Sequence, residues 1–179
     1  MVRTRVGYAG GTKHHPTYHD LGDHTESIEI VYDPAVLTYE ALLGEFWQQH
    51  DPHYASGSRQ YRAAAMTQSP DQERIARASK EALGYPAATS IEPLTTFTPA
   101  EDYHQKYYLR RSREIVQALI RLTGDERAFM DTTAAARLNA YFGGACTAAD
   151  VAAELAALGL DAPTVDGLMT RIRRAAGDR

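Results

Sequence analysis

The sequence TESIEIVY at residues 25–32 contains the clearest strand signal in the chain. Its apolar side chains stand at every second position from Ile28 to Tyr32, which is typical of a half-buried β-strand. The turn at Asp33-Pro34 leads to a helix expected over residues 38–50, with Thr38 as its N-cap. This stretch therefore predicts a strand followed closely by a helix.

Strand and helix signals continue on both sides of this stretch. Further strands are expected at residues 2–8, 61–67 and 90–97. Two helices are expected after capping signatures with proline at the first helical position, Ser69-Pro70 and Thr98-Pro99, the second helix running to about Leu109. Because the strands are short and partly adjacent without helical crossovers, the predicted class is α+β, a two-layer α/β sandwich with a mixed sheet.

The composition changes near residue 110. No histidine or lysine follows that position, and alanine and leucine dominate. Helices are expected around residues 112–122, 126–142, 148–158 and 164–175, the third of them after a capping box at Thr147. We therefore expect an α/β domain over residues 1–110 and an all-helical extension over residues 111–179 that packs on it.

Length and composition exclude several classes of protein. The 179 residues are 44% hydrophobic and 23% charged, as in a globular domain. No apolar run suits a membrane span and no signal-like segment opens the chain, so no membrane association and a cytoplasmic location are expected. The net charge of -4 argues against a nucleic-acid partner. The single cysteine, Cys146, excludes intrachain disulfides and cysteine-rich zinc sites.

Histidines and carboxylates gather in four short clusters, but none has a recognised metal-ligand spacing, so no metal site is expected. Glu26 is a stronger candidate. The alternation places it on the same strand face as Ile28 and Ile30, and an inward carboxylate could act as an acid near neutral pH. The alternative is a solvated carboxylate at a strand entrance. Tyr18 and Tyr61 have a similar alternative as amphipathic aromatics at the edge of the core.

Several short motifs follow one another in about the first 110 residues. They are Gly7-Tyr8-Ala9-Gly10-Gly11, Pro16-Thr17-Tyr18, Gly22-Asp23-His24-Thr25-Glu26, Tyr32-Asp33-Pro34, Phe46-Trp47, His50-Asp51-Pro52, Gln60-Tyr61-Arg62 and Ala100-Glu101-Asp102-Tyr103-His104-Gln105. In this order, they resemble the peptide methionine sulfoxide reductase A family.

The resemblance implies an oxidoreductase of protein repair under oxidative stress, which reduces methionine-S-sulfoxide to methionine without a cofactor. A cysteine thiolate attacks the sulfoxide sulfur, and thioredoxin is the implied electron donor. Carried over by position, Glu26 is the catalytic acid, and Tyr18 and Tyr61 bind the substrate oxygen. The family also has an aspartate five residues before the second tyrosine, and that position holds Ser56.

The nucleophile is where the sequence departs from the family pattern. The family's Gly-Cys-Phe-Trp motif belongs before Gly7, and only six residues precede Gly7 here. We therefore expect a truncated, inactive active site, with codons for the motif in frame before Met1. Two alternatives remain: a non-catalytic module that binds methionine sulfoxide, and activity through Cys146.

Overall fold

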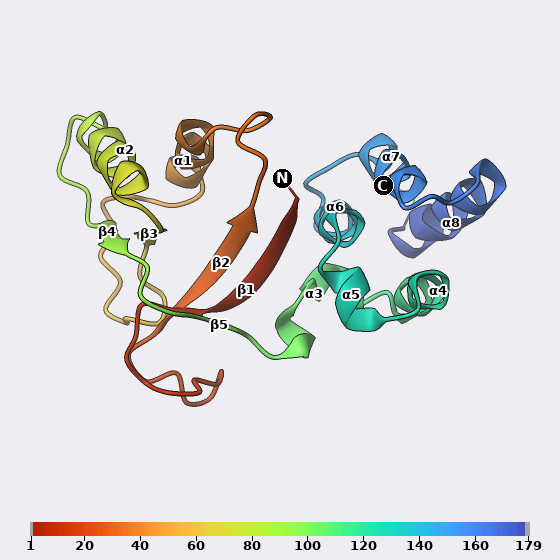
Figure 1. Ribbon diagram of the computed structural model, residues 1–179, viewed down its shortest axis with the longest axis horizontal. Helices are drawn as coiled ribbons and strands as arrows, with labels where there is room; N and C mark the ends of the chain where they lie inside the picture. Colours follow the sequence, from red (N-terminus) through yellow and green to blue (C-terminus); the bar gives the residue numbers. More distant parts are fainter. Residues whose placement is uncertain (1, 178–179) are drawn as a thin grey trace. The chain divides into compact units, whose positions relative to one another are not determined.

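The computed structural model describes residues 2–177, and these fall into two compact units. The first unit contains residues 6–101. The second contains residues 102–177 together with residues 2–5. The first unit combines strands with two helices and the second is helical, so the predicted α+β class is confirmed (Figure 1). The division at residue 110, by contrast, stays a prediction.

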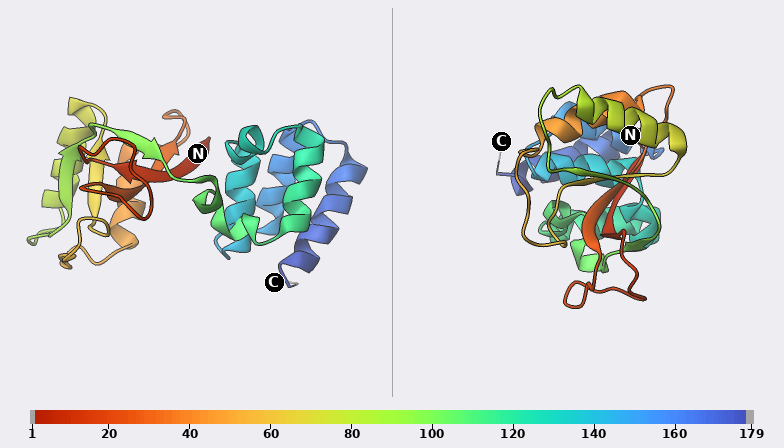
Figure 2. Two further views of the ribbon diagram at one scale, coloured as in Figure 1. Left: turned by 90° about the horizontal axis from the view of Figure 1, so that it is seen from below. Right: turned by 90° about the vertical axis from the view of Figure 1, so that its left-hand side faces the viewer.

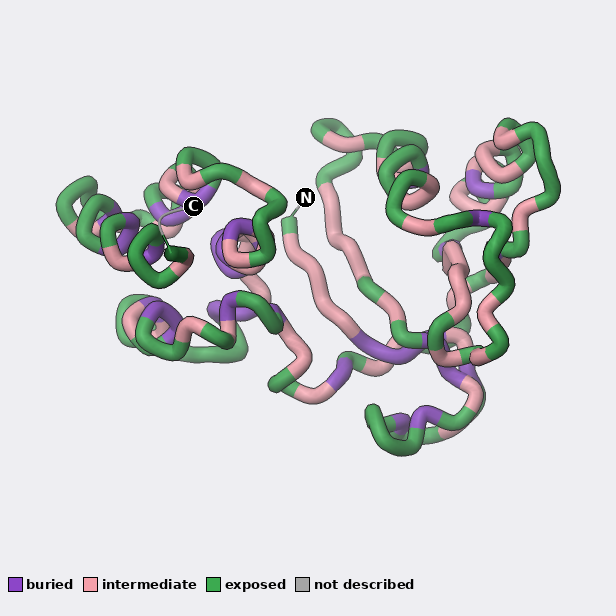
Figure 3. The backbone as a smooth tube through the Cα atoms, turned by 180° about the vertical axis from the view of Figure 1, so that it is seen from behind, coloured by how far each residue is buried: buried purple, intermediate pink, exposed green. Residues whose placement is uncertain are grey.

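The strands of the first unit form two small sheets. Strands β1 (Arg3–Ala9), β2 (Thr25–Val31) and β5 (Phe97–Pro99) are ordered β2-β1-β5, with β1 and β5 antiparallel. Strands β3 (Ala64–Thr67) and β4 (Ser90–Pro93) form a separate parallel pair. The last three residues of β1 are buried, and the tube in Figure 3 shows this end of the strand as the buried part.

Gly7 permits the close pairing of β1 with β5. A Cβ atom at this position would lie 2.4 Å from the carbonyl oxygen of Thr98 and 2.6 Å from the Phe97 ring. No side chain fits there, so a glycine is required where the two strands meet.

Two helices cover the parallel pair. Helix α1 (Tyr39–Gln48) begins at the predicted cap Thr38, whose hydroxyl accepts from the Ala41 N–H at 3.2 Å. Helix α2 (Pro70–Glu81) begins at the predicted cap Ser69 in the same way. Their apolar faces meet β4 in a small core of Leu43, Ala76 and Ile91.

The helix predicted from Thr98 to Leu109 is wrong. Thr98 lies within strand β5, opposite Tyr8 of β1. A short 3₁₀ turn, η1 (Asp102–His104), and helix α3 (Tyr107–Arg110) follow separately. The reason is that the carboxylate of Glu101, which a capping box would use locally, accepts instead from the Tyr8 hydroxyl at 2.5 Å and the Tyr18 N–H at 3.0 Å.

The second unit is built from helices around one apolar core (Figure 2). After α3 come α4 (Arg113–Thr123), α5 (Glu126–Met130), α6 (Thr133–Phe142), α7 (Ala148–Ala157) and α8 (Ala162–Ala175). The single helix predicted over 126–142 is divided, because Thr132 caps α6 by accepting from the Ala135 N–H at 3.1 Å. The capping box predicted at Thr147 is present. None of the helices between residues 2 and 177 is long and apolar enough to cross a membrane.

Candidate functional site

Glu26 lies near the start of β2 and is held by Gln60. Its backbone N–H donates to the Gln60 carbonyl at 3.0 Å, and its Oε1 accepts from the Gln60 amide at 2.6 Å. The side chain is exposed, so of the two alternatives the structure has the solvated carboxylate at a strand entrance. Ile28 on the same face is 58% exposed, because this face of the edge strand β2 is open to solvent within the described chain.

Tyr18 is positioned by its backbone. It belongs to the loop between β1 and β2, next to a tight bridge between Thr17 and Asp20. Its N–H donates to Glu101 at 3.0 Å, and Glu101 in turn accepts from the buried Tyr8 hydroxyl. This carboxylate therefore links the end of β5 to the loop that carries Tyr18.

Tyr61 lies near both Tyr18 and Glu26. Partial desolvation of its hydroxyl raises its pKa, as do the neighbouring Tyr18 and Glu26 and a hydrogen bond with Tyr18. A hydrogen bond with the Gln60 side chain opposes this rise. The structure therefore brings together all three residues that the sequence predicted as a site, Tyr18, Glu26 and Tyr61.

Asp23 and His24 have structural roles beside this cluster. The Asp23 carboxylate accepts from the Thr12 N–H and hydroxyl and from the Lys13 N–H, and these hydrogen bonds hold its pKa well below the ordinary value. The buried His24 ring accepts from the Gly11 N–H at Nδ1, 3.2 Å, and donates from Nε2 to the Lys13 carbonyl, 2.9 Å. Both ring nitrogens are used, as in a neutral imidazole.

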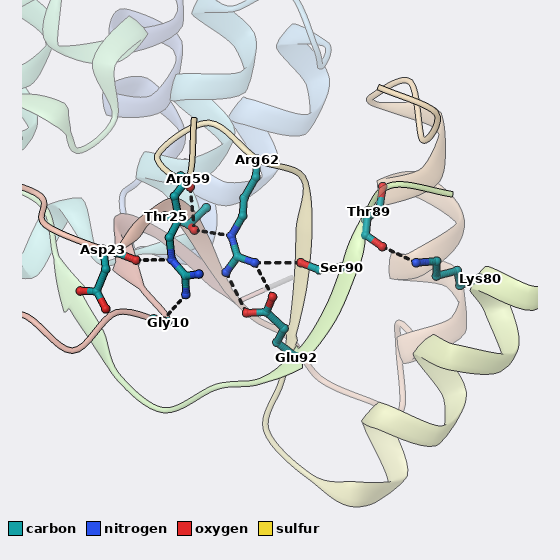
Figure 4. Close-up of polar contacts among 9 residues, drawn as sticks. All are labelled: Gly10, Asp23, Thr25, Arg59, Arg62, Lys80, Thr89, Ser90 and Glu92. Atoms are coloured by element: carbon teal, nitrogen blue, oxygen red, sulfur yellow. Dashed lines mark hydrogen bonds and ion pairs between the residues drawn. The ribbon is translucent and has the colours of Figure 1, made fainter. Parts of the chain in front are cut away.

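Two arginines fix the segment that carries Gln60 and Tyr61 (Figure 4). Arg59 donates to the carbonyls of Asp23 at 2.6 Å and Gly10 at 3.2 Å. Arg62 donates to the Thr25 hydroxyl at 2.9 Å and forms a two-pronged ion pair with Glu92, one prong at 2.7 Å. Residues 59–62 are therefore tied at both ends to the strands and loops around them.

Ser56, at the position of the family aspartate, makes a local turn. Its hydroxyl donates to the Ser58 carbonyl at 3.1 Å and accepts from the Ser58 N–H at 3.2 Å. Hydrogen bonds of this kind are common for a serine in a turn.

Cys146 belongs to the helical unit, between α6 and α7. Its thiol donates to the Arg137 carbonyl at 3.2 Å and packs against the apolar core. Burial, aided by the nearby Asp150, raises the pKa of this thiol despite Arg137. A raised pKa lowers the thiolate fraction, which is the reactive form.

Over the described residues 2–177, no three His, Cys, Asp or Glu side chains are grouped as a metal ion would require. His50 illustrates why the clusters do not serve this purpose. Its Nδ1 lies 2.8 Å from the Phe46 carbonyl and its Nε2 lies 2.8 Å from the Thr89 hydroxyl. This ring joins the end of α1 to the segment before β4.

The described chain is thus an α+β protein in which a carboxyl group and two phenols, those of Glu26, Tyr18 and Tyr61, lie near one another. Residues 1–136 match the family model described as "Peptide methionine sulfoxide reductase". The chain therefore belongs to the peptide methionine sulfoxide reductase family, whose members act on methionine sulfoxide.

Similar proteins come from plants and archaea. The chain is 38% identical over 157 residues to "Peptide methionine sulfoxide reductase A5" of Oryza sativa subsp. japonica, a match that covers 82% of this chain and 61% of the rice protein. It is 40% identical over 126 residues to "Peptide methionine sulfoxide reductase MsrA" of Methanoculleus marisnigri, a match that covers 62% of this chain and 77% of that protein. The chain thus spans about three fifths of the length of the plant relatives that it matches.

A solved structure supports the fold. The crystal structure of reduced Mxr1 from Saccharomyces cerevisiae superposes with a TM-score of 0.50 at 28% identity, covering 62% of this chain and 71% of that one.

Sequence reasoning identified Tyr18, Glu26 and Tyr61 but missed the residues that hold them. Gln60 and Glu101 both lie in the motifs that resemble the family, yet neither had an assigned role. Their partners are distant in the chain: Gln60 contacts Glu26, 34 residues away, and Glu101 contacts Tyr18, 83 residues away. The presence of a polar residue within a family motif was the only available signal.

Proposed function

We propose that Tyr18, Glu26 and Tyr61 bind the oxygen of methionine sulfoxide. The observation that carries this proposal is the convergence of these three side chains from a loop, a strand and a second loop. A sulfoxide oxygen carries partial negative charge and accepts hydrogen bonds, and phenols and a protonated carboxyl group donate them. Membership of the family supports the assignment.

The same hydrogen-bond donors would also assist reduction of the sulfoxide. When a thiolate attacks the sulfoxide sulfur, a transient sulfur–sulfur bond forms and the oxygen takes up a proton. The protonated oxygen then passes to the cysteine sulfur as the substrate's sulfur–oxygen bond and the sulfur–sulfur bond break, which gives the sulfide and a cysteine sulfenic acid. Negative charge develops on the oxygen during this step, so a proton from Glu26 and hydrogen bonds from the two tyrosines stabilise the transition state. We therefore propose the reductase chemistry of the family for this site, with the thiolate as the other reactant.

The raised pKa of Cys146 argues against this thiol as the attacking group. Binding of the sulfoxide is accordingly the property that we propose for residues 1–179 themselves. The resemblance to the family supports three finer proposals: methionine-S-sulfoxide, free or within proteins, as the substrate; thioredoxin as the electron donor; and a cytoplasmic role in repair of oxidised proteins.

Titration calorimetry with N-acetyl-methionine-S-sulfoxide amide tests the proposal, with the corresponding sulfide as the comparison ligand. The sulfoxide is expected to bind and the sulfide to bind several-fold more weakly, since only the sulfoxide accepts these hydrogen bonds. Glu26→Ala and Tyr61→Phe should each weaken sulfoxide binding several-fold, because each removes a donor. Glu45→Ala, an exposed change on α1, is the matched control. Equal affinity for sulfoxide and sulfide in a folded sample would reject the proposal.

A further inference from the structure

Gln60 is hydrogen-bonded to Glu26 and directly precedes Tyr61 in the chain, so it adjoins two of the three proposed oxygen-binding residues. Its amide nitrogen lies 2.6 Å from Oε1 of Glu26, and its backbone carbonyl accepts from the Glu26 N–H at 3.0 Å. Backbone and side chain of one residue thus hold the same glutamate at two points. This double contact fixes both the position of Glu26 on β2 and the direction of its carboxyl group.

Gln60 also precedes Tyr61 in the segment that the two arginines anchor, so it bears on that residue as well. A carboxamide carries two N–H groups, so one can donate to Glu26 and the other to the phenol oxygen of Tyr61. A donor on a phenol oxygen favours the phenolate and lowers the pKa, which is the direction of the Gln60 effect on Tyr61.

The chain on both sides of Gln60 is anchored by hydrogen bonds. The residues on either side, Arg59 and Tyr61-Arg62, belong to the segment that the two arginines anchor to Asp23, Thr25 and Glu92. Donors that are already oriented before the ligand arrives stabilise developing charge better than donors that must reorganise. A half-buried amide on an anchored segment provides that orientation.

We propose that Gln60 is a positioning residue that aligns Glu26 and Tyr61 for hydrogen bonding to the sulfoxide oxygen. This inference rests on the proposed function, and it assigns to Gln60 a role that acts through its two neighbours. Rotation of the carboxamide by 180° would also let its oxygen accept from Glu26 when that group is protonated, so the same residue can serve both protonation states of the acid.

The test compares wild type with Gln60→Leu and Gln60→Glu in the full 179-residue chain. Leucine removes both donors, and glutamate keeps the shape but presents oxygens to the Glu26 carboxylate. Both variants are expected to bind N-acetyl-methionine-S-sulfoxide amide a few-fold more weakly, and no more weakly than the variants that remove a direct hydrogen bond to the ligand, because Gln60 acts only through its neighbours. Gln48→Leu is the matched control, since the exposed Gln48 amide donates only to the Gly44 carbonyl of its own helix.

A second measurement separates positioning from loss of structure. Tyrosine labelled with ¹³C at Cζ allows each phenol to be titrated by NMR, and Tyr61→Phe assigns the Tyr61 resonance. Because Gln60 lowers the pKa of Tyr61, Gln60→Leu should raise that pKa further, whereas Gln48→Leu should leave it unchanged.

The outcomes distinguish the inference from the function on which it rests. If wild type binds the sulfoxide and both Gln60 variants bind equally well, or if the Tyr61 titration does not move, the positioning role is overturned and the proposed function stands. If wild type shows no preference for the sulfoxide over the sulfide, the proposed function fails, and the role of Gln60 fails with it. Weaker binding together with a higher Tyr61 pKa supports both.

Discussion

The contact between Gly11 and His24 shows how tightly single residues are specified next to the site. A Cβ atom on Gly11 would lie 2.5 Å from two carbon atoms of the His24 ring and 2.7 Å from an Asp23 carboxylate oxygen. The ring cannot move aside easily, because it is buried and both of its nitrogens are hydrogen-bonded. The second glycine of the Gly10-Gly11 pair is therefore required by packing.

Gly11→Ala is expected to destabilise the protein by about 1–3 kcal/mol, the usual cost of overpacking a close contact. Urea unfolding measures the change in the free energy of unfolding. Gly57→Ala is the matched control, since a Cβ at Gly57 meets no atom within 4 Å. Equal stability of the two variants would contradict the packing argument.

Cys146 is expected to be a slow nucleophile. Burial and Asp150 raise the pKa of its thiol, so less thiolate is present at pH 8 than in an unfolded chain. Iodoacetamide should therefore alkylate the folded protein more slowly than the urea-unfolded protein. Asp150→Asn should speed alkylation because it removes a negative charge near the sulfur, and Asp166→Asn on α8 serves as control.

Cys146→Ser should leave any dithiothreitol-driven reduction of methionine sulfoxide unchanged. Activity that vanished in this variant would show that Cys146 takes part in the chemistry despite its surroundings.

At the scale of elements, capping predictions succeeded where the interaction is local. Thr38, Ser69 and Thr147 each accept from a backbone N–H three residues ahead, so four consecutive residues contain the whole signal. The prediction at Thr98 failed because Glu101 meets partners 83 and 93 residues away. The environment of Glu26 stayed open for a similar reason: alternation along a strand identifies a face, but whether anything covers that face depends on the rest of the fold.

The ion pair between Arg62 and Glu92 links the two small sheets of the first unit, since Arg62 also donates to Thr25 of β2. Arg62→Met is expected to cost about 1–3 kcal/mol, because it leaves Glu92 without its charged partner. Arg77→Met is the control: its pair with Glu73 lies on the exposed face of α2 and should contribute under about 0.5 kcal/mol. Chemical unfolding at pH 7 measures how much each variant lowers the free energy of unfolding.

The pH dependence of this pair has a definite sign. The Arg62 guanidinium holds the pKa of Glu92 below its ordinary value in the folded state. The ion pair therefore contributes fully to stability above the pKa that Glu92 has in the unfolded chain. This contribution is lost as the pH falls through the lower pKa that Glu92 has in the folded protein. The stability difference between wild type and Arg62→Met should shrink on acidification, and a constant difference would contradict this assignment.

At the scale of the whole molecule, Lys106 ties the beginning of the chain to the helical unit. Its side chain is only 6% exposed, and its ammonium donates to the Thr4 carbonyl at 2.6 Å. Thr133 makes a similar link, donating to the Val2 carbonyl at 2.6 Å. Residues 2–5 are therefore part of the helical unit although 96 residues separate them from the rest of it.

Burial, opposed by Asp131 and reinforced by Arg5 and Arg110, lowers the pKa of Lys106 to about 8. An unfolded lysine stays protonated to about pH 10.4, so between these values the folded state binds fewer protons and the free energy of unfolding rises with pH. Wild type should therefore gain stability relative to Lys106→Met between pH 8 and about pH 10. Urea unfolding over this range measures the difference, and tyrosine ionisation cancels because both proteins contain the same tyrosines.

The strand face that carries Glu26 is open to solvent, so water competes with a ligand for the hydrogen bonds of this site. Tyr61 is 61% exposed and Ile28 is 58% exposed, so liquid water reaches the donors that we assign to the sulfoxide oxygen. Each hydrogen bond to the ligand then replaces one to solvent and contributes little net free energy. Affinity of the described chain for a single methionine sulfoxide should consequently be weak, on the order of millimolar. Strong discrimination by this site would require an apolar surface laid over it, one that excludes water and lowers the local dielectric constant.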